Sequence, residues 1–229
     1  MAAPQMSQEI AEEAAWLTVA ILGGTGDQGR GLARRLALAG NRVIIGSRNA
    51  GRAEAAAAEL GSPPQVTGVE NEEAARVADL VIVAVPWEGH AELLAGLAGA
   101  LEGKIVVDCV NPIAFDARGA YPIPVPEGSA AQQAAAVLRG STVVGAFHHV
   151  SAMLLLDPEV DAFDLDVMVL GDSRHATDLV QALAERIPGM RGVYAGRLRN
   201  CGQVEALTAN LVSVNRRYKA HAGLRITDI

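Results

Sequence analysis

A glycine-rich turn near the N-terminus constrains this chain more than any other feature. The apolar run 17–22 has the all-hydrophobic pattern of a strand that is buried on both faces of a sheet. It is followed by Gly24-x-Gly26-x-x-Gly29 and then by a helical pattern that ends near Gly40. A strand, a glycine turn and a helix in this order form the context in which such glycines bind a dinucleotide.

Each glycine has a distinct expected task at this turn. We expect Gly24 to permit the tight turn, Gly26 to let the backbone approach a pyrophosphate, and Gly29 to allow close packing of the helix on the strand. The N–H groups and the dipole of the new helix would then face the phosphates. The alternative is a purely structural turn that binds no ligand.

The end of the second strand predicts which dinucleotide is bound. Residues 43–46 lead into Ser47 and Arg48, where a site for NAD usually offers Asp or Glu to the ribose hydroxyls. A carboxylate there would repel a 2′-phosphate, whereas a hydroxyl and a guanidinium can hydrogen-bond and neutralise it. Arg52 is expected on the first turn of the next helix, where a cation opposes the helix dipole unless an anion lies nearby. These residues favour NADP over NAD, although both arginines could also be ordinary surface charges.

Strand and helix patterns alternate along the rest of the chain, which predicts an α/β fold with a Rossmann-type, doubly wound, mostly parallel sheet. Further strands are expected over 65–69, 80–85, 104–108, 142–147 and 164–170. Helices are expected over 88–101, 129–138, 173–187 and 200–220, from Asn71, and from Ala50 to an end at Gly61 before Pro63 and Pro64. Residues 114–128 contain three prolines and are expected to form an extended loop.

The change of pattern after residue 147 suggests a division of the chain. We expect an N-terminal extension over 1–16, an NADP-binding Rossmann domain over 17–147, and a small C-terminal α+β domain over 148–229. The final helix carries one stripe that we expect to serve core packing or a dimer face. This stripe consists of Val204, Leu207, Thr208, Leu211, Asn215 and Tyr218.

Charge and cysteine content exclude several classes of partner. The net charge of −7 argues against nucleic acid. Residues from Arg174 onward carry nine Lys or Arg and four Asp or Glu, a surplus of +5 that would suit an anionic ligand or only a solvated face. The two cysteines lie far apart, and no apolar run reaches membrane-spanning length. We therefore expect no metal, no membrane association, and a soluble cytoplasmic protein.

Ligands of an open α/β sheet bind beyond the carboxyl ends of its strands. The residues expected there include Val85-Pro86-Trp87, Asn111 and His148-His149-Val150, without a Lys–Asp pair or a Ser/His/Asp arrangement. His148 or His149 is a candidate acid–base residue, because histidine titrates near neutrality, or else part of a hydrogen-bonded loop. Trp87 is expected to be a platform for a nicotinamide ring or a helix-packing residue.

Several motifs together resemble those of the F420-dependent NADP oxidoreductases. They are Gly23–Gly29, Gly46-Ser47-Arg48, Val85-Pro86-Trp87 and Phe147-His148, and the segment 196–207 extends the match to nearly the whole chain from Thr18. The resemblance implies that Thr25 to Gln28 hold NADP, with the 2′-phosphate on Thr25, Ser47, Arg48 and Arg52. It also implies a homodimer and a C-terminal domain that completes a cleft for the deazaflavin coenzyme F420.

The full predicted cofactor-binding set follows from the strand ends and this resemblance. It comprises Gly24, Thr25, Gly26, Asp27, Gln28, Gly29, Ser47, Arg48, Arg52, Val85, Pro86, Trp87, His148, Val150 and Ala152. The family commonly has isoleucine and proline where this chain has Val150 and Ser151, so the surface that packs against the rings differs here.

The activity that the resemblance implies is reversible hydride transfer between C5 of F420 and C4 of the nicotinamide. Both carriers bring their own reactivity, so we expect no certain catalytic side chain, and only an orienting or electrostatic role for His148. Two other functions stay open at this point. One is an NADP-dependent reductase of a small imine, ketone or metal ion, and the other is a non-catalytic NADP sensor.

Overall fold

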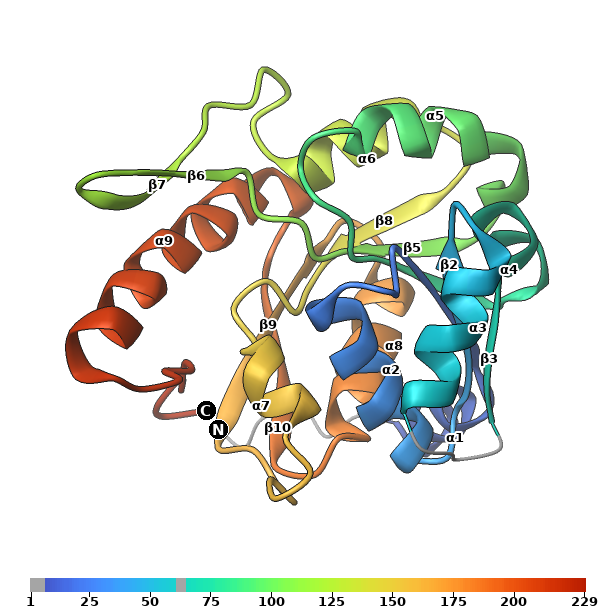
Figure 1. Cartoon of the computed structure of the whole chain (residues 1–229), viewed down its shortest axis with the longest axis horizontal. Coiled ribbons are helices and arrows are strands. Elements are labelled where there is room, and N and C mark those ends of the chain that lie inside the picture. The colour runs from blue at the N-terminus through green and yellow to red at the C-terminus, as the bar shows by residue number, and fades with distance from the viewer. Residues whose placement is uncertain (1–6, 61–64) are drawn as a thin grey trace.

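One eight-stranded sheet runs through the molecule in the computed structural model, which describes residues 7–60 and 65–229 (Figure 1). Its spatial order is β3-β2-β1-β4-β5-β8-β9-β10. The strands β3 to β8 in this order are parallel, whereas β9 is antiparallel to β8 and β10 is parallel to β9. The strands are β1 (Thr18–Leu22), β2 (Arg42–Ser47), β3 (Val66–Glu70), β4 (Leu80–Val83), β5 (Ile105–Asp108), β8 (Thr142–Gly145), β9 (Leu165–Gly171) and β10 (Met190–Gly196).

The order of the six parallel strands is that of a dinucleotide-binding sheet, with the reversal of strand order between β1 and β4. The predicted doubly wound α/β fold is therefore confirmed. This reversal point matters for function because ligands of such sheets bind in the crevice that it opens at the carboxyl ends of the strands.

Helices cover both faces of the sheet, and each face has its own apolar core. One core lies under α1 (Gln8–Trp16), α2 (Asp27–Leu38), α3 (Ala50–Glu59), α7 (Ala152–Leu156) and α8 (Arg174–Glu185). The other lies under α4 (Asn71–Val77), α5 (His90–Leu101), α6 (Ala130–Val137) and the start of α9 (Cys201–Tyr218), which follows a short 3-10 turn, η1 (Leu198–Asn200). Strand residues alternate between the cores: Ile21 packs into the first and Leu22 into the second. Each such buried side chain contributes about 1.5–3 kcal/mol.

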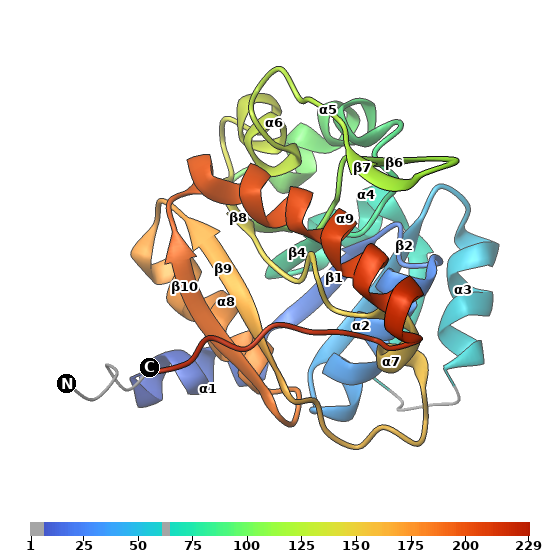
Figure 2. The same ribbon diagram turned by 90° about the vertical axis from the view of Figure 1, so that its left-hand side faces the viewer.

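Residues after position 147 join this same sheet through β9 and β10. The proposed domain boundary there stays a prediction. The segment after α9 turns back along β9 (Figure 2) and is fixed there by hydrogen bonds, because Asp166 N donates to Leu224 O at 2.7 Å and Ile226 N donates to the Asp166 carboxylate. The buried Asp166 carboxylate also accepts from Arg191 at 2.7 and 2.9 Å and from Arg225 at 3.0 Å.

Several parts of the secondary structure differ from the expectation, among them α7, which the sequence pattern did not predict. Residues 114–128 are not one extended loop, because β6 (Ile113–Asp116) and β7 (Gly119–Pro122) form an antiparallel hairpin. The Asp116 side chain closes its turn by accepting from the backbone N–H groups of Arg118 and Gly119, and Gly119 has a φ of 128°. This Asp-x-x-Gly signal outweighs the prolines that follow it.

Another difference is β10, an edge strand that the pattern did not predict. Gly192 and Gly196 weaken its apolar alternation, and most of its residues are only half-buried. Residues 8–16 of the expected extension form α1, whose Ala14 is fully buried. The expected helix end at Gly61 with Pro63 and Pro64, and residues 1–6, lie outside the described residues.

The ion cluster around Asp166 yields a stability prediction. Asp166→Ala leaves Arg191, Arg225 and Ile226 N without their shared acceptor, so we expect a loss of about 2–4 kcal/mol in the free energy of unfolding. Urea denaturation measures this loss. The matched control is Asp172→Ala, which removes an exposed ion pair of 3.7 Å with Arg197 and should cost under about 1 kcal/mol. Equal effects of the two substitutions would contradict a central role for Asp166.

Candidate cofactor site

The glycine turn brings the ends of β1 and β2 into contact. Gly24 N donates to Gly46 O at 3.1 Å, and a Cβ on Gly24 would lie 2.8 Å from Ile21 O. The left-handed backbone conformation falls on Gly23, with a φ of 70°, rather than on Gly24. Both positions therefore exclude larger residues, one through its backbone angle and the other through lack of space.

The other two glycines have the geometry that a bound pyrophosphate needs. A Cβ on Gly29 would lie 2.6 Å from Gly24 Cα, so Gly29 allows α2 to pack closely on the turn after β1, where close packing on the strand itself was expected. At Gly26, by contrast, the nearest atom to such a Cβ is Gly23 O at 3.7 Å, which leaves the approach to the backbone open. Gly26 is also the N-cap of the twelve-residue helix α2 and provides no capping side chain. The first N–H groups of a helix without such a cap can bind an anion, so this turn fits a pyrophosphate.

Cationic and hydroxyl groups lie at the end of β2, beside this turn. Ser47 is buried, and its Oγ accepts from Asn49 N at 3.3 Å. Asn49 caps α3 by accepting from Arg52 N at 3.0 Å, which places Arg52 on the first turn of that helix, as predicted. The side chains of Arg48 and Arg52 are exposed. The carboxyl end of β2 thus has the hydroxyl and guanidinium donors that are expected at a phosphate site.

Asp27 and Gln28 make contacts that the sequence did not predict. Asp27 pairs with Arg30 at 2.8 Å, and Arg30 reaches Glu59 of α3 at 2.7 Å. Gln28 Nε2 donates to Phe147 O, just beyond the end of β8, at 3.3 Å. The dinucleotide turn therefore contacts both α3 and the segment that carries the two histidines.

Trp87, beyond the end of β4, stacks on a buried histidine that the sequence analysis missed. The ring centroids of Trp87 and His90 are 5.7 Å apart, with an interplanar angle of 29°. His90 is hydrogen-bonded to Asp108 Oδ2 at 2.7 Å and to Gln133 Oε1 at 3.0 Å. Burial lowers the pKa of His90, but the bond to Asp108 and its charge outweigh burial, so the pKa is raised. A polar Asp108 at the end of an apolar strand was the one available signal for this pair.

The two histidines beyond β8 are buried and uncharged at neutral pH. Burial lowers the pKa of both His148 and His149 to about 4. His149 Nε2 accepts from Met168 N at 3.4 Å, whereas neither ring nitrogen of His148 has a hydrogen-bond partner within the described part of the chain. They follow Phe147, a buried residue with a φ of 62°, which is strained for an aromatic residue.

Glu205, in the first turns of α9, is a second buried group that the sequence did not single out. Its carboxylate accepts from Ala130 N at 2.8 Å and Ala131 N at 3.2 Å, at the start of α6. It lies 4.0 Å from His148 Nε2, and burial raises its pKa to about 7. Since His148 is neutral, this contact is not an ion pair. Glu205 binds α9 to α6, and no local pattern could have revealed a partner 75 residues away.

Further hydrogen bonds join α9 to the strand ends. Asn111 Nδ2 donates to His148 O at 2.8 Å, and Thr208 Oγ1 donates to the same carbonyl at 3.3 Å. Val150 is buried, and Ala152 is half-buried at the start of α7. Of the predicted stripe on α9, Val204 and Leu211 are in the core, whereas Tyr218 is 73% exposed.

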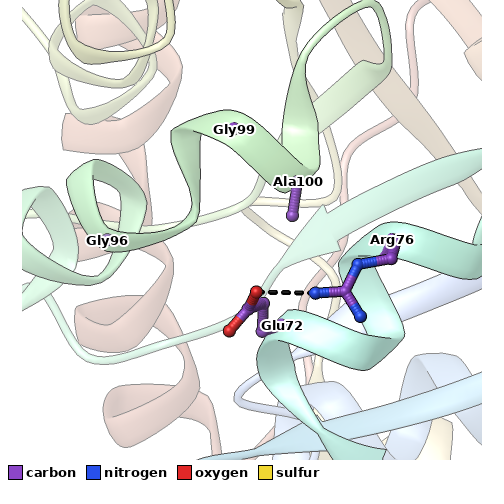
Figure 3. Close-up of a pocket in the computed structure, with 5 residues that line it drawn as sticks. All are labelled: Glu72, Arg76, Gly96, Gly99 and Ala100. Atoms are coloured by element: carbon purple, nitrogen blue, oxygen red, sulfur yellow. Dashed lines mark hydrogen bonds and ion pairs between the residues drawn. The ribbon is translucent and has the colours of Figure 1, made fainter.

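The predicted residues thus form two groups along one sheet edge. Ser47, Arg48 and Arg52 lie at the β2 end, and His148, Val150 and Ala152 lie at the β8 end, with β1, β4 and β5 between. Figure 3 shows a hollow lined by Glu72, Arg76, Gly96, Gly99 and Ala100, which lies between α4 and α5. The C-terminal ends of α4 and α5 lead into the amino ends of β4 and β5, so this hollow does not lie at the carboxyl ends of the strands, where the cofactor site is expected.

Residues 7–60 and 65–229 contain no group of three or more His, Cys, Asp or Glu that could hold a metal ion. No helix within the same ranges has the length and apolar character that a membrane crossing requires.

Comparison with known proteins places these features in a family. Residues 18–112 match the family model for coenzyme F420-dependent NADP oxidoreductases. The chain is 40% identical to the F420-dependent NADP reductase of Methanothermobacter marburgensis, over 93% of this chain and 99% of that protein. It is 39% identical to the enzyme of the same name from Methanocaldococcus jannaschii, again over 93% and 99% of the two chains.

A solved structure agrees with these sequence matches. The structure from Arthrobacter sp. FB24, described as a candidate F420-dependent NADP reductase, superposes with a TM-score of 0.80 at 27% identity. The match covers 93% of this chain and all of that one. The resemblance found in the motifs is therefore confirmed over nearly the whole chain, which belongs to the F420-dependent NADP reductase family.

Proposed function

We propose that this protein transfers a hydride reversibly between reduced coenzyme F420 and NADP. The observation that carries this proposal is the identity of 38–40% over 93% of the chain with three proteins named F420-dependent NADP reductase. The open glycine turn and the basic end of β2 support NADP as one of the two cofactors.

Different residues bind the pyrophosphate, the 2′-phosphate and the nicotinamide of NADP. The backbone of residues 24–29 and the start of α2 bind the pyrophosphate, while Ser47, Arg48 and Arg52, with Thr25, bind the 2′-phosphate. The nicotinamide lies near Val85, Pro86 and Trp87. The second cofactor lies between the strand ends and α9, near His148, Val150 and Ala152, with the basic surplus after Arg174 toward its anionic tail.

Orientation, rather than proton transfer by a side chain, is the main contribution of the protein. When both are bound, the deazaflavin supplies the hydride from C5, the nicotinamide accepts it at C4, and the accompanying proton passes to solvent. The residues around the strand ends would supply much of the acceleration by holding the two rings in a reactive orientation. The histidines beyond β8 are buried and neutral, so they add no positive charge at this end of the site, where the Glu205 carboxyl is the group that titrates near neutral pH.

A homodimer and a cytoplasmic location are part of the same proposal. The β6–β7 hairpin lies against α9, and the two elements expose Phe115, Tyr121 and Tyr218, which are aromatic residues of the kind enriched at interfaces. We assign the dimer contact to this face.

The cysteines support the cytoplasmic location. Cys109 and Cys201 are both free and buried, as expected for a protein from a reducing compartment.

The proposed activity predicts a direct optical result. Mixing the protein with NADPH and oxidised F420 should bleach the visible absorbance of F420, and NADH should replace NADPH poorly. Binding of NADPH without any loss of F420 absorbance would instead favour the sensor, and reduction of an imine, a ketone or a metal ion in place of F420 would favour another reductase. The three relatives that match over nearly their whole length are named F420-dependent NADP reductase, whereas the match to a metalloreductase, at 34% identity over 82% of this chain, covers only 36% of that protein.

Arg48 gives a prediction about cofactor choice. Arg48→Ala should weaken NADPH binding by about 1.5–3 kcal/mol, the range for hydrogen bonds to charged groups, and should leave NADH binding nearly unchanged. Calorimetry with both cofactors measures the difference. Arg42→Ala is the matched control, because Arg42 is exposed at the other end of the same strand. Equal losses for the two cofactors would show that Arg48 serves the fold.

The histidines give a prediction about the hydride step. His148→Ala and His149→Ala should each lower the single-turnover rate at saturating cofactors by much less than the roughly 10²–10⁴-fold that loss of a general acid or base causes. Stopped-flow absorbance of F420 gives this rate. A larger loss in a variant with an unchanged far-ultraviolet circular dichroism spectrum would make that histidine catalytic.

The same burial predicts how stability depends on pH. The pKa of His148 falls from its ordinary 6.5 to about 4 on folding, so its contribution is present above pH 6.5 and is lost as the pH falls toward 4. His148→Leu should therefore reduce the loss of unfolding free energy between pH 7 and pH 5 by about 2 kcal/mol. Urea denaturation at the two pH values measures this, with His175→Leu, on the exposed side of α8, as control. An unchanged pH slope would mean that His148 is accessible to protons in the folded state.

A further inference from the structure

Helix α2 touches both halves of the proposed site. Its first turn forms the dinucleotide turn, and Gln28 on that turn holds Phe147 O. Its middle lies against α7, because a Cβ on Gly31 would come within 2.5 Å of Leu155 Cβ. The segment that contains Val150 and Ala152 is therefore attached to α2, the helix whose first turn faces the NADP phosphates in the proposed site.

Arg35, at the other end of α2, is the strongest of these attachments. Its side chain is buried, and it donates four hydrogen bonds to backbone carbonyls of the segment that follows Ala152. The acceptors are Leu154 O at 2.8 Å, Leu155 O at 2.8 Å, Asp157 O at 2.7 Å and Val160 O at 2.6 Å. The guanidinium carbon also lies 4.9 Å from the centre of the Phe163 ring.

This arrangement depends on the shape of arginine. A planar guanidinium spreads its donors over several fixed directions, whereas a lysine ammonium has three donors at a single point. Lysine at position 35 would keep the charge and much of the stem but could not hold all four carbonyls. The α7 segment would then be free to shift relative to α2.

We propose that Arg35 is a positioning residue for hydride transfer: by fixing residues 152–160 to α2, it sets the separation of the two cofactor rings. The proposal rests on the placement of F420 near Val150 and Ala152 that the proposed function makes. Arg35 touches neither reacting carbon. It acts through α7, and it affects the distance between C5 of F420 and C4 of the nicotinamide, to which hydride transfer is very sensitive.

The test compares Arg35→Lys with Arg34→Lys, the same change one residue earlier on α2. Arg34 is half-buried, and its Nε has no partner within the described residues. Arg35→Lys should leave the NADPH dissociation constant within about twofold and lower the single-turnover rate about tenfold or more. Its primary isotope effect with NADPH deuterated at C4 should become more dependent on temperature, since a longer transfer distance requires more thermal motion. Arg34→Lys should match the wild type in all three.

Hydrogen–deuterium exchange of the protein without cofactors provides a readout independent of activity. Amides of residues 152–160 should exchange faster in Arg35→Lys than in Arg34→Lys, while those of α5 stay unchanged. Faster exchange with a wild-type rate and isotope effect would show that Arg35 is structural only, and would overturn the proposal. Unchanged exchange would overturn it as well.

A second variant covers the case in which Arg35→Lys does not fold. Gly31→Ala adds a methyl group against Leu155 while raising helix propensity, so it displaces α7 and leaves Arg35 in place. It should give the same slow rate and altered isotope effect, and wild-type values would count against the proposal. Failure of the wild-type protein to reduce F420 at all would refute the proposed function itself, and this inference with it, a result that no variant can imitate.

Discussion

The lack of a side chain at Gly29 is the constraint on which this structure depends most. With a Cβ there, α2 would collide with Gly24 Cα, and the helix would have to move away from the end of β1. That movement would pull Gln28 from Phe147 O, Gly31 from Leu155 and Arg35 from its four carbonyls at once, because all three are on the same rigid helix. The contact between Gly29 and Gly24 therefore controls both the shape of the glycine turn and the position of the segment 150–160, which α2 holds.

The electrostatic character of the site changes from one end to the other. Exposed guanidinium groups at the end of β2 suit a hydrated phosphate, where solvent screens part of their attraction. At the end of β8, burial keeps His148 and His149 neutral, and the buried ionisable groups nearby are Glu205, whose pKa burial raises to about 7, and the His90–Asp108 pair beside Trp87. This division suits a ligand that is held by its phosphates at one end and reacts through a ring at the other. Catalysis by orientation has most effect in a dry place, since no solvent must reorganise.

The sequence predicted those parts of the fold that local patterns encode. An all-apolar run such as Leu80–Val83 fits a strand that is buried on both faces of a sheet. The glycine turn can be recognised from the sequence because one short segment contains all of its glycines. The β6–β7 hairpin was missed because three prolines outweighed a turn signal, and β10 because an edge strand needs less apolar alternation. The site was harder to predict. Gln28 meets Phe147 across 119 residues and Glu205 meets Ala130 across 75, so only the topology of the sheet could bring these groups together.

The antiparallel strand β9 has a consequence for the size of the ligand. Strand ends face the same edge only as long as neighbouring strands are parallel, and this row stops at β8, because β9 presents its amino end there. From β2 to β8 the row spans four interstrand spacings, on the order of 19 Å. The sheet thus acts as a ruler for the dinucleotide. In the proposed placement, a molecule anchored at Arg48 reaches Trp87, beyond β4, across two of these spacings, on the order of 10 Å, and the two spacings from β4 to β8 are left for the second cofactor.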